Sequence, residues 1–227
     1  METSDMGTSE TSLIMQELAQ RLSGDAGEES AQLFRALLCE LVAGSPVSRE
    51  RLSELMGWPV NKVSAALEQA PGVEYDSAGH IIGYGLTLRE TPHAFEVDGR
   101  RLYTWCALDA LIFPSLVGNT AQVFSSCAAT RAPVRLTVTP DGIRDLDPAG
   151  AMVSLVPPDA SADVRSAFCC HVHFFASAAA ADAWAGAQAN VAIVSVHDAF
   201  RLGQSLVQRL SAPTLSSCGP ACAEAHA

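Results

Sequence analysis

Two stretches near the start of the chain carry apolar side chains at the spacing of a helix. In residues 13–22 and 33–42, large apolar side chains recur three and four positions apart, which places them on one helical face. Gly24, Gly27 and Gly44 interrupt the pattern and mark the helix ends. The sequence therefore predicts two amphipathic helices.

A helix, a tight turn, another helix and a hairpin are predicted next. Ser48 is an N-cap residue in front of a helix that ends at Gly57, and a further short helix has an apolar face around Val63. Residues 73–76 and 81–88 are rich in β-branched and aromatic side chains on either side of a turn, which predicts a hairpin. Helices followed by such a hairpin are typical of a winged-helix domain.

From residue 94 onward the pattern changes to short strands separated by turns and interrupted by three helices. The expected strands cover residues 94–97, 123–126, 134–139, 152–156, 171–175 and 192–196. The expected helices cover residues 105–113, ending at Pro114, then 178–188 and 197–210. Because the strands do not alternate regularly with crossover helices, the fold class is α+β, with a mixed or largely antiparallel sheet and flanking helices.

The pattern divides the chain into four segments. Residues 1–11 are small and polar and are expected to be a disordered leader, and residues 212–227, rich in alanine, serine, glycine and proline, a flexible tail. Residues 12–90 form the expected winged-helix-like domain. It packs on a core formed by residues 91–211.

Charge and hydropathy limit the partners and the location. The chain has 227 residues and a formal net charge of −11, whereas contacts to nucleic acid or to anionic lipid need clustered lysine and arginine. We therefore expect no nucleic-acid partner and no membrane partner. No apolar run reaches the roughly 18 to 20 residues of a membrane helix, and residues 1–12 are unlike a signal peptide. A cytoplasmic protein is expected.

Seven cysteines are present. In a reducing cytoplasm they indicate thiol or metal chemistry rather than a disulfide framework, and their odd number agrees.

The first candidate motif is Cys106 with Asp109. A strand runs into a helix here, with Thr104 as the expected cap and Cys106 in the first turn, where the helix dipole lowers the pKa of a thiol toward neutrality. Asp109 lies three residues on, on the same helical face. The alternative is a buried small cysteine beside a surface carboxylate. The motif alone does not decide between these interpretations.

The second candidate motif contains Cys169 and Cys170. Adjacent side chains of an extended chain point to opposite sides, so only one of them can face a given site, and we choose Cys169. His171 and His173 would then share its side, which makes a zinc site with Cys169 an alternative. The spacing of ordinary zinc sites is absent, so partly buried strand histidines are favoured.

A third pair of cysteines lies near the end of the chain. Cys218 and Cys222 flank a glycine and a proline and could close on a soft metal ion, or they could belong to a tail without a role. The sequence leaves both possibilities open.

Several stretches together resemble the organomercurial (alkylmercury) lyases of bacterial mercury-resistance systems. They are Pro46-Val47-Ser48-Arg49, Tyr84-Gly85-Leu86-Thr87-Leu88, Trp105-Cys106-Ala107-Leu108-Asp109 and Phe168-Cys169-Cys170-His171-Val172-His173-Phe174-Phe175. The resemblance runs from about residue 33 to 210. It implies a winged-helix-like domain on a lyase core, no added metal cofactor, and catalysis by Cys106, Cys169 and Asp109. Cys127 matches a cysteine that looks structural in the family.

The implied reaction is protonolysis of a carbon–mercury bond. Mercury prefers sulfur ligands, so Cys106 and Cys169 would bind R–Hg⁺, and later Hg²⁺ beside Asp109. Asp109 would carry a proton from a thiol to carbon, provided that burial raises its pKa toward neutrality. Low-molecular-weight thiols and a mercuric reductase are the expected acceptors of mercury.

Two other functions remain alternatives. The winged-helix pattern and the cysteines would also fit a metal-sensing DNA-binding regulator, although the expected recognition helix carries a single basic residue, Lys62. A thiol protein that buffers metal without catalysis would bind mercury and release no hydrocarbon.

Overall fold

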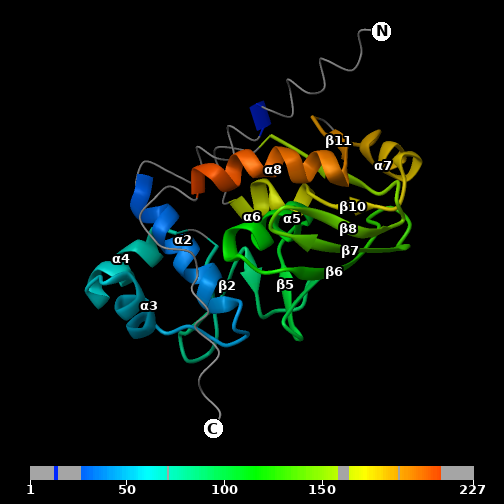
Figure 1. The fold of residues 1–227 in the computed structure, drawn as a ribbon. Coiled ribbons are helices and arrows are strands. Elements are labelled where there is room, and N and C mark those ends of the chain that lie inside the picture. Colours follow the sequence, from blue (N-terminus) through cyan, green and yellow to red (C-terminus); the bar gives the residue numbers. More distant parts are fainter. Residues whose placement is uncertain (1–12, 15–26, 71, 158–163, 189, 211–227) are drawn as a thin grey trace.

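The computed structural model describes residues 13–14, 27–70, 72–157, 164–188 and 190–210 (Figure 1). Three helices and a hairpin form one end of the molecule, and sheets covered by helices form the other. The predicted α+β class is confirmed. The expected leader and tail, most of the helix at 13–22, and Cys218 and Cys222 lie outside the described residues.

In residues 27–70, the helices before the hairpin are α2 (Gly27–Leu41), α3 (Arg49–Met56) and α4 (Val60–Glu68). The side chain of Ser48 accepts a hydrogen bond from the backbone N–H of Arg51, as predicted for an N-cap. Gly57 ends α3 in the left-handed region, with φ of 64°, a conformation in which glycine has no steric penalty. Local sequence signals therefore determine these helix ends.

An eight-stranded sheet runs through both ends of the molecule. Its strands are β1 (Glu74–Tyr75), β2 (Ile81–Tyr84), β3 (Leu86–Thr87), β4 (His93–Val97), β5 (Arg100–Thr104), β6 (Ala121–Ser126), β7 (Pro133–Thr139) and β8 (Gly142–Asp147). Their order is β1-β2-β3-β5-β4-β6-β7-β8, and neighbours pair antiparallel. The predicted single strand at residues 81–88 was wrong, because the chain turns back at Gly85 and β2 pairs antiparallel with β3. Strand β3 in turn pairs with β5 and joins the hairpin to the core sheet.

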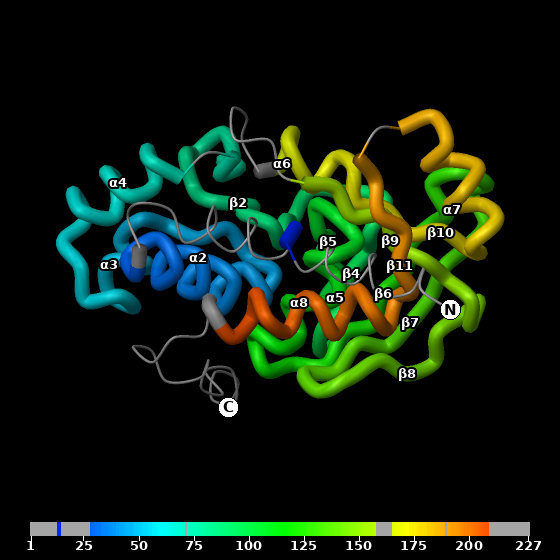
Figure 2. The backbone as a smooth tube through the Cα atoms, turned by 90° about the horizontal axis from the view of Figure 1, so that it is seen from above, coloured from blue at the N-terminus to red at the C-terminus, as the bar shows by residue number. Residues whose placement is uncertain are grey.

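A smaller sheet and five helical segments complete the core. The sheet has the order β10-β9-β11, formed by β9 (Met152–Leu155), β10 (Phe174–Phe175) and β11 (Ala192–Ser195). The helical segments are α5 (Ala107–Val117), α6 (Val164–Ala167), the 3₁₀ helix η1 (Cys169–His171), α7 (Ala178–Ala185) and α8 (Val196–Leu210). Figure 2 shows α8 running along α5, and the two helices pack together.

Helix α5 is central to the core. Nine of its side chains are buried, as expected for a helix that is apolar on all sides. The prediction that it ends at Pro114 was wrong: α5 continues to Val117 and ends at Gly118, whose N–H donates to Pro114 O at 2.9 Å. A proline removes one hydrogen bond of the helix, and burial on all sides keeps this helix intact.

The predicted strand at residues 171–175 was also wrong over its first half. Cys169–His171 form the 3₁₀ helix η1, and only Phe174 and Phe175 pair with β9. The hydroxyl of Ser154 donates to His171 O and accepts from His173 N–H. A side chain therefore satisfies backbone groups that a strand neighbour would otherwise bind.

Strand β8 was not predicted, because its exposed polar residues lack the apolar alternation of a core strand.

No helix among the described residues is long and apolar enough to cross a membrane.

Candidate active site

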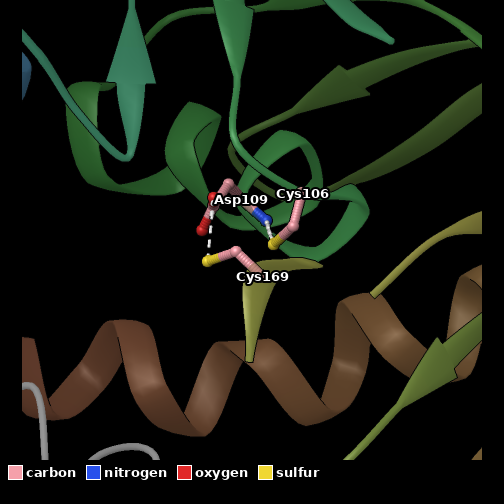
Figure 3. A group of neighbouring side chains, drawn as sticks. All are labelled: Cys106, Asp109 and Cys169. Atoms are coloured by element: carbon pink, nitrogen blue, oxygen red, sulfur yellow. Dashed lines mark hydrogen bonds between the residues drawn. The ribbon is translucent and has the colours of Figure 1, made fainter. Parts of the chain in front are cut away.

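Cys106, Asp109 and Cys169 lie together although they are distant in sequence. Their sulfur and carboxylate ligand atoms all lie within 4.8 Å of one another. Figure 3 shows Cys169 facing Cys106 and Asp109 from the opposite segment of the chain. Among the described residues this is the one group of three or more histidine, cysteine or acidic side chains that could hold a metal ion. The structure thus brings together all three predicted site residues.

Cys106 is itself the N-cap of α5, so the prediction of Thr104 as the cap was wrong. Cys106 has an extended backbone, and its Sγ accepts the N–H of Asp109 at 3.4 Å. The buried Thr104 hydroxyl instead donates to Cys106 O at 3.0 Å. The cap fixes the sulfur directly beside the residue that carries the carboxylate.

The predicted lowering of the pKa of Cys106 was wrong as well. Complete burial raises this pKa well above its ordinary value, and the hydrogen bond to Cys169 and the negative charge of Asp109 act in the same direction. The hydrogen bond that Cys106 accepts from the N–H of Asp109 lowers it, but desolvation outweighs this contribution. In the absence of a cation, Cys106 is therefore a thiol.

The pKa of Cys169 is raised for similar reasons. Its hydrogen bond with Cys106 lowers its pKa, but burial and the charge of Asp109 together raise it further. Two neutral thiols therefore line the site. A soft cation must displace their protons in order to bind.

Asp109 is the group that can take such a proton. Burial raises its pKa to about 7, against hydrogen bonds from Cys106 and Cys169 that lower it. This agrees with the predicted shift toward neutrality. The thiol of Cys169 donates to Asp109 Oδ2 at 3.9 Å, so a path for the proton already exists.

Cys169 is positioned by the short helix η1. Val172 N–H donates to Cys169 O, and Val172 O accepts the N–H of Ala107 at the start of α5. The two cysteine segments are thus connected by backbone hydrogen bonds. Cys169 is buried beside Cys106 and Asp109, whereas Cys170 is exposed. The predicted strand that motivated the choice of Cys169 is absent.

The alternative zinc site is not formed. His171 is exposed, and the ring of His173 packs edge-on against Trp184 with the ring centroids 5.4 Å apart. Neither joins Cys169 in the group described above.

Cys127 lies apart from the site, in a small core cluster with Phe175 and Ala181. Its sulfur accepts the N–H of Thr130 at 3.4 Å. This packing agrees with a structural cysteine.

Sequence reasoning missed the neighbours of the two cysteine segments. The guanidinium of Arg165 lies 4.9 Å from the centroid of the Trp105 ring and forms an ion pair with Glu74 of β1. No sequence motif predicts these contacts, because Glu74, Trp105 and Arg165 are brought together only by the fold.

Comparisons with known proteins point in one direction. A family profile described as alkylmercury lyase matches residues 86–208. A second, described as the helix-turn-helix domain of alkylmercury lyase, matches residues 14–85. An alkylmercury lyase of Pseudomonas putida is 55% identical over 199 residues, which cover 87% of this chain and 94% of that protein. The chain belongs to the alkylmercury lyase family.

Other relatives agree with this membership. An alkylmercury lyase of Staphylococcus epidermidis is 48% identical over 86% of this chain and 92% of its own length. A solved structure described as the mercury-bound form of MerB2 covers 89% of this chain and all of that chain, with a TM-score of 0.76 and 22% identity. At that identity the likeness shows the fold. The predicted family and enzyme class are confirmed.

Proposed function

We propose that this enzyme cleaves carbon–mercury bonds by protonolysis, R–Hg⁺ + H⁺ → R–H + Hg²⁺, with Cys106 and Cys169 as mercury ligands and Asp109 as the proton carrier. One observation carries the proposal: two buried thiols and a carboxyl whose pKa is about 7 lie within 4.8 Å of one another. Mercury binds sulfur in preference to oxygen or nitrogen. The site therefore offers the ligands that this cation prefers.

The first step is exchange of the organic mercury ion onto Cys106. A small-thiol complex, R–Hg–SR′, transfers R–Hg⁺ to Cys106 Sγ, and the proton of Cys106 leaves with R′S⁻ as R′SH. The sulfur–mercury bond to R′ breaks as the bond to Cys106 forms. Burial then leaves the bound mercury surrounded by protein groups.

The second sulfur activates the carbon. Cys169 gives its proton to the carboxylate of Asp109, with which it is already in contact, and its thiolate binds mercury. A second thiolate ligand increases the carbanion character of the carbon attached to mercury. The protonated carboxyl of Asp109 then delivers that same proton to carbon, and the electron pair of the carbon–mercury bond becomes the new C–H bond.

The products are R–H and Hg²⁺ held by Cys106 and Cys169, with mercury in the same oxidation state throughout. Two external thiols would then remove Hg²⁺ and restore both protein thiols. A mercuric reductase is the proposed later acceptor. Because protein groups supply both the ligands and the proton, the reaction as proposed needs no resident cofactor. Its demand for reduced thiols favours a cytoplasmic location.

The test is to incubate the reduced protein with methylmercury and excess thiol and to measure methane and inorganic mercury. We expect Cys106→Ser and Cys169→Ser each to reduce turnover by at least about 100-fold, and the double variant to be no worse than either, because cleavage of the carbon–mercury bond needs both sulfurs on mercury. Cys170→Ser is the matched control and should retain activity. Absence of methane from the wild-type protein would overturn the proposed function.

Asp109→Asn separates binding from chemistry. We expect it to bind methylmercury with little change and to lose about 100-fold or more in methane release, the usual contribution of a positioned acid–base group. Undiminished methane release by this variant would remove Asp109 from the mechanism.

A further inference from the structure

Arg165 connects three parts of the molecule beside the site. It lies on α6, four positions before Cys169. Figure 2 shows α6 on the border between the helical end and the core. The Arg165 guanidinium forms an ion pair with Glu74 of β1 and stacks on the ring of Trp105, the residue directly before Cys106. One side chain thus contacts the hairpin of the amino-terminal part and the segment leading into Cys106, while its own helix leads into Cys169.

Glu74 is held in place to receive this cation. Its side chain is only 6% exposed, and each of its carboxylate oxygens has a partner: Arg165 donates to Oε1 and the Thr87 hydroxyl donates to Oε2. A β-carbon at Gly83 would collide with this carboxylate and with Thr87. A carboxylate this far from solvent requires a paired cation. The packing of Gly83 and Thr87 in the hairpin therefore holds Glu74 in position for its ion pair with Arg165.

The segment that carries Cys169 needs such support. Helix α6 has four residues and η1 has three, and helices this short have little stability of their own. The contact from Cys169 Sγ to Asp109 Oδ2 is 3.9 Å long, so a small displacement of η1 would break it. Displacements of about 1 Å in an active site can reduce rates by about 100-fold.

We propose that Glu74 and Arg165 are a positioning pair for the lyase reaction: through Arg165, the amino-terminal hairpin holds α6 and η1 against Trp105, so that Cys169 stays within reach of Asp109 and of mercury bound to Cys106. The inference rests on the proposed function. Neither residue touches the reacting atoms, and both act through the placement of Cys169. The amino-terminal part is then a component of the active site.

The test compares Glu74→Gln, Arg165→Gln, the double variant and Arg165→Lys in steady-state assays with methylmercury and excess thiol. We expect kcat to fall about 10-fold or more in the glutamine variants, with KM changed by less than about threefold, because Cys106 can still capture R–Hg⁺. The double variant should resemble either single variant, since both remove one contact. Arg165→Lys should recover part of kcat, because it keeps the charge and loses the planar stacking.

The ion pair of Arg51 with Glu40 provides a matched control. It joins α3 to α2 within the amino-terminal part at 2.7 Å, away from α6. Glu40→Gln and Arg51→Gln should leave both kcat and KM within about twofold of wild type, as is usual for an exposed pair. Rates are expressed per folded protein, with the folded fraction determined from urea unfolding.

Three outcomes would overturn the positioning pair: glutamine variants with wild-type kcat, losses in kcat that add in the double variant, or losses fully explained by the fraction of unfolded protein. If Arg165→Gln does not fold, Glu74→Gln and Arg165→Lys make the same comparison. A wild-type protein that releases no methane would instead refute the proposed function, so the two failures are distinguishable.

Discussion

Asp109 is subject to opposing influences on its charge. It lies in the first turn of α5, where the helix dipole favours a carboxylate, and contacts with Cys106 and Cys169 also stabilise the ionised form. Desolvation outweighs them, because the helix is surrounded by apolar side chains, and the resulting pKa of about 7 suits the proposed role, in which Asp109 accepts a proton and returns it. A carboxyl with an ordinary pKa would accept the proton of Cys169 poorly.

The raised pKa of Asp109 has a consequence for stability. The carboxyl has an ordinary pKa of 3.8 and a folded-state pKa of about 7, so between these values the folded state binds more protons than the unfolded state. The free energy of unfolding must then fall as pH rises through this window. We predict that the free energy of unfolding of wild type minus that of Asp109→Asn decreases from about pH 4 to about pH 7 and is flat above.

Urea denaturation of both proteins at a series of pH values, with a reducing agent present, measures this difference. Asp198 offers a control of opposite sign, because hydrogen bonds from Ser195 and Arg201 lower its pKa. The corresponding difference for Asp198→Asn should increase with pH in the acidic range. A difference for Asp109 that is independent of pH would contradict the proposed protonation state of the site.

At the scale of elements, features with a local cause could be predicted from sequence. Helix α3 begins after Ser48 and ends at Gly57, because an N-cap and a left-handed residue each act on the helix turn next to them. The strands at residues 134–139 and 192–196 were predicted to within one residue because apolar and β-branched side chains mark them. These signals do not depend on the rest of the fold.

Features with a tertiary cause could not be predicted. The 3₁₀ turn at Cys169 depends on the hydroxyl of Ser154 from a different strand, and α5 continues past Pro114 because its surroundings bury it. The same distinction applies to the site. The family motif predicted Cys106, Asp109 and Cys169 as site residues, whereas the raised pKa values of the two thiols follow from burial that no local pattern reveals.

Gly85 lies where the turn between β2 and β3 packs on α5, and a single added methyl group should disrupt this packing. It has φ of +78°, and a β-carbon there would lie 2.8 Å from Phe113 Cζ of α5. We predict that Gly85→Ala lowers the free energy of unfolding by about 1–2 kcal/mol for the left-handed backbone and by about 1–3 kcal/mol more for overpacking. Chemical denaturation measures the sum.

Gly99→Ala separates the two contributions. Gly99 has φ of +74° and nothing within 4 Å of an added β-carbon, so it should show the backbone cost alone. Equal losses in the two variants would mean that the Phe113 contact relaxes without cost and that the packing of Gly85 on α5 is loose.

Helix α4 occupies the place of a recognition helix, yet its charge does not suit DNA. Its one basic residue, Lys62, forms an ion pair with Glu29 at 2.6 Å and lies over the ring of Trp58. We predict no shift of duplex DNA in a gel assay at about 50 mM salt, where phosphate contacts are strongest. The double variant Glu29→Gln, Glu68→Gln provides a sensitivity control with less negative charge. Retardation of DNA by the wild-type protein that weakens with salt would instead give this domain a second role.

At the scale of the whole molecule, the amino-terminal part and the core share one sheet. Leu86 pairs with Thr104 and Thr87 with Tyr103 across β3 and β5, and the backbone N–H of Trp105 donates to Gly85 O at 2.9 Å. Helix α2 packs on both α5 and α8. The two parts share a sheet, pack through α2, and are joined by an ion pair whose carboxylate is buried. They therefore have few ways to separate without exposing apolar surface.

We therefore predict a single cooperative unfolding transition. Trp58 reports on the amino-terminal part, and Trp184, packed on Phe175 with the ring centroids 5.2 Å apart, reports on the core. In urea, the midpoint from tryptophan fluorescence should equal the midpoint from far-ultraviolet circular dichroism in wild type, Trp58→Phe and Trp184→Phe alike, since coincident probes define a two-state transition. An early fluorescence phase that vanishes only in Trp58→Phe would show that the amino-terminal part unfolds first. Such independence would weaken the case that its Glu74 holds the active site in place, because a part that opens alone cannot fix Arg165 while it is open.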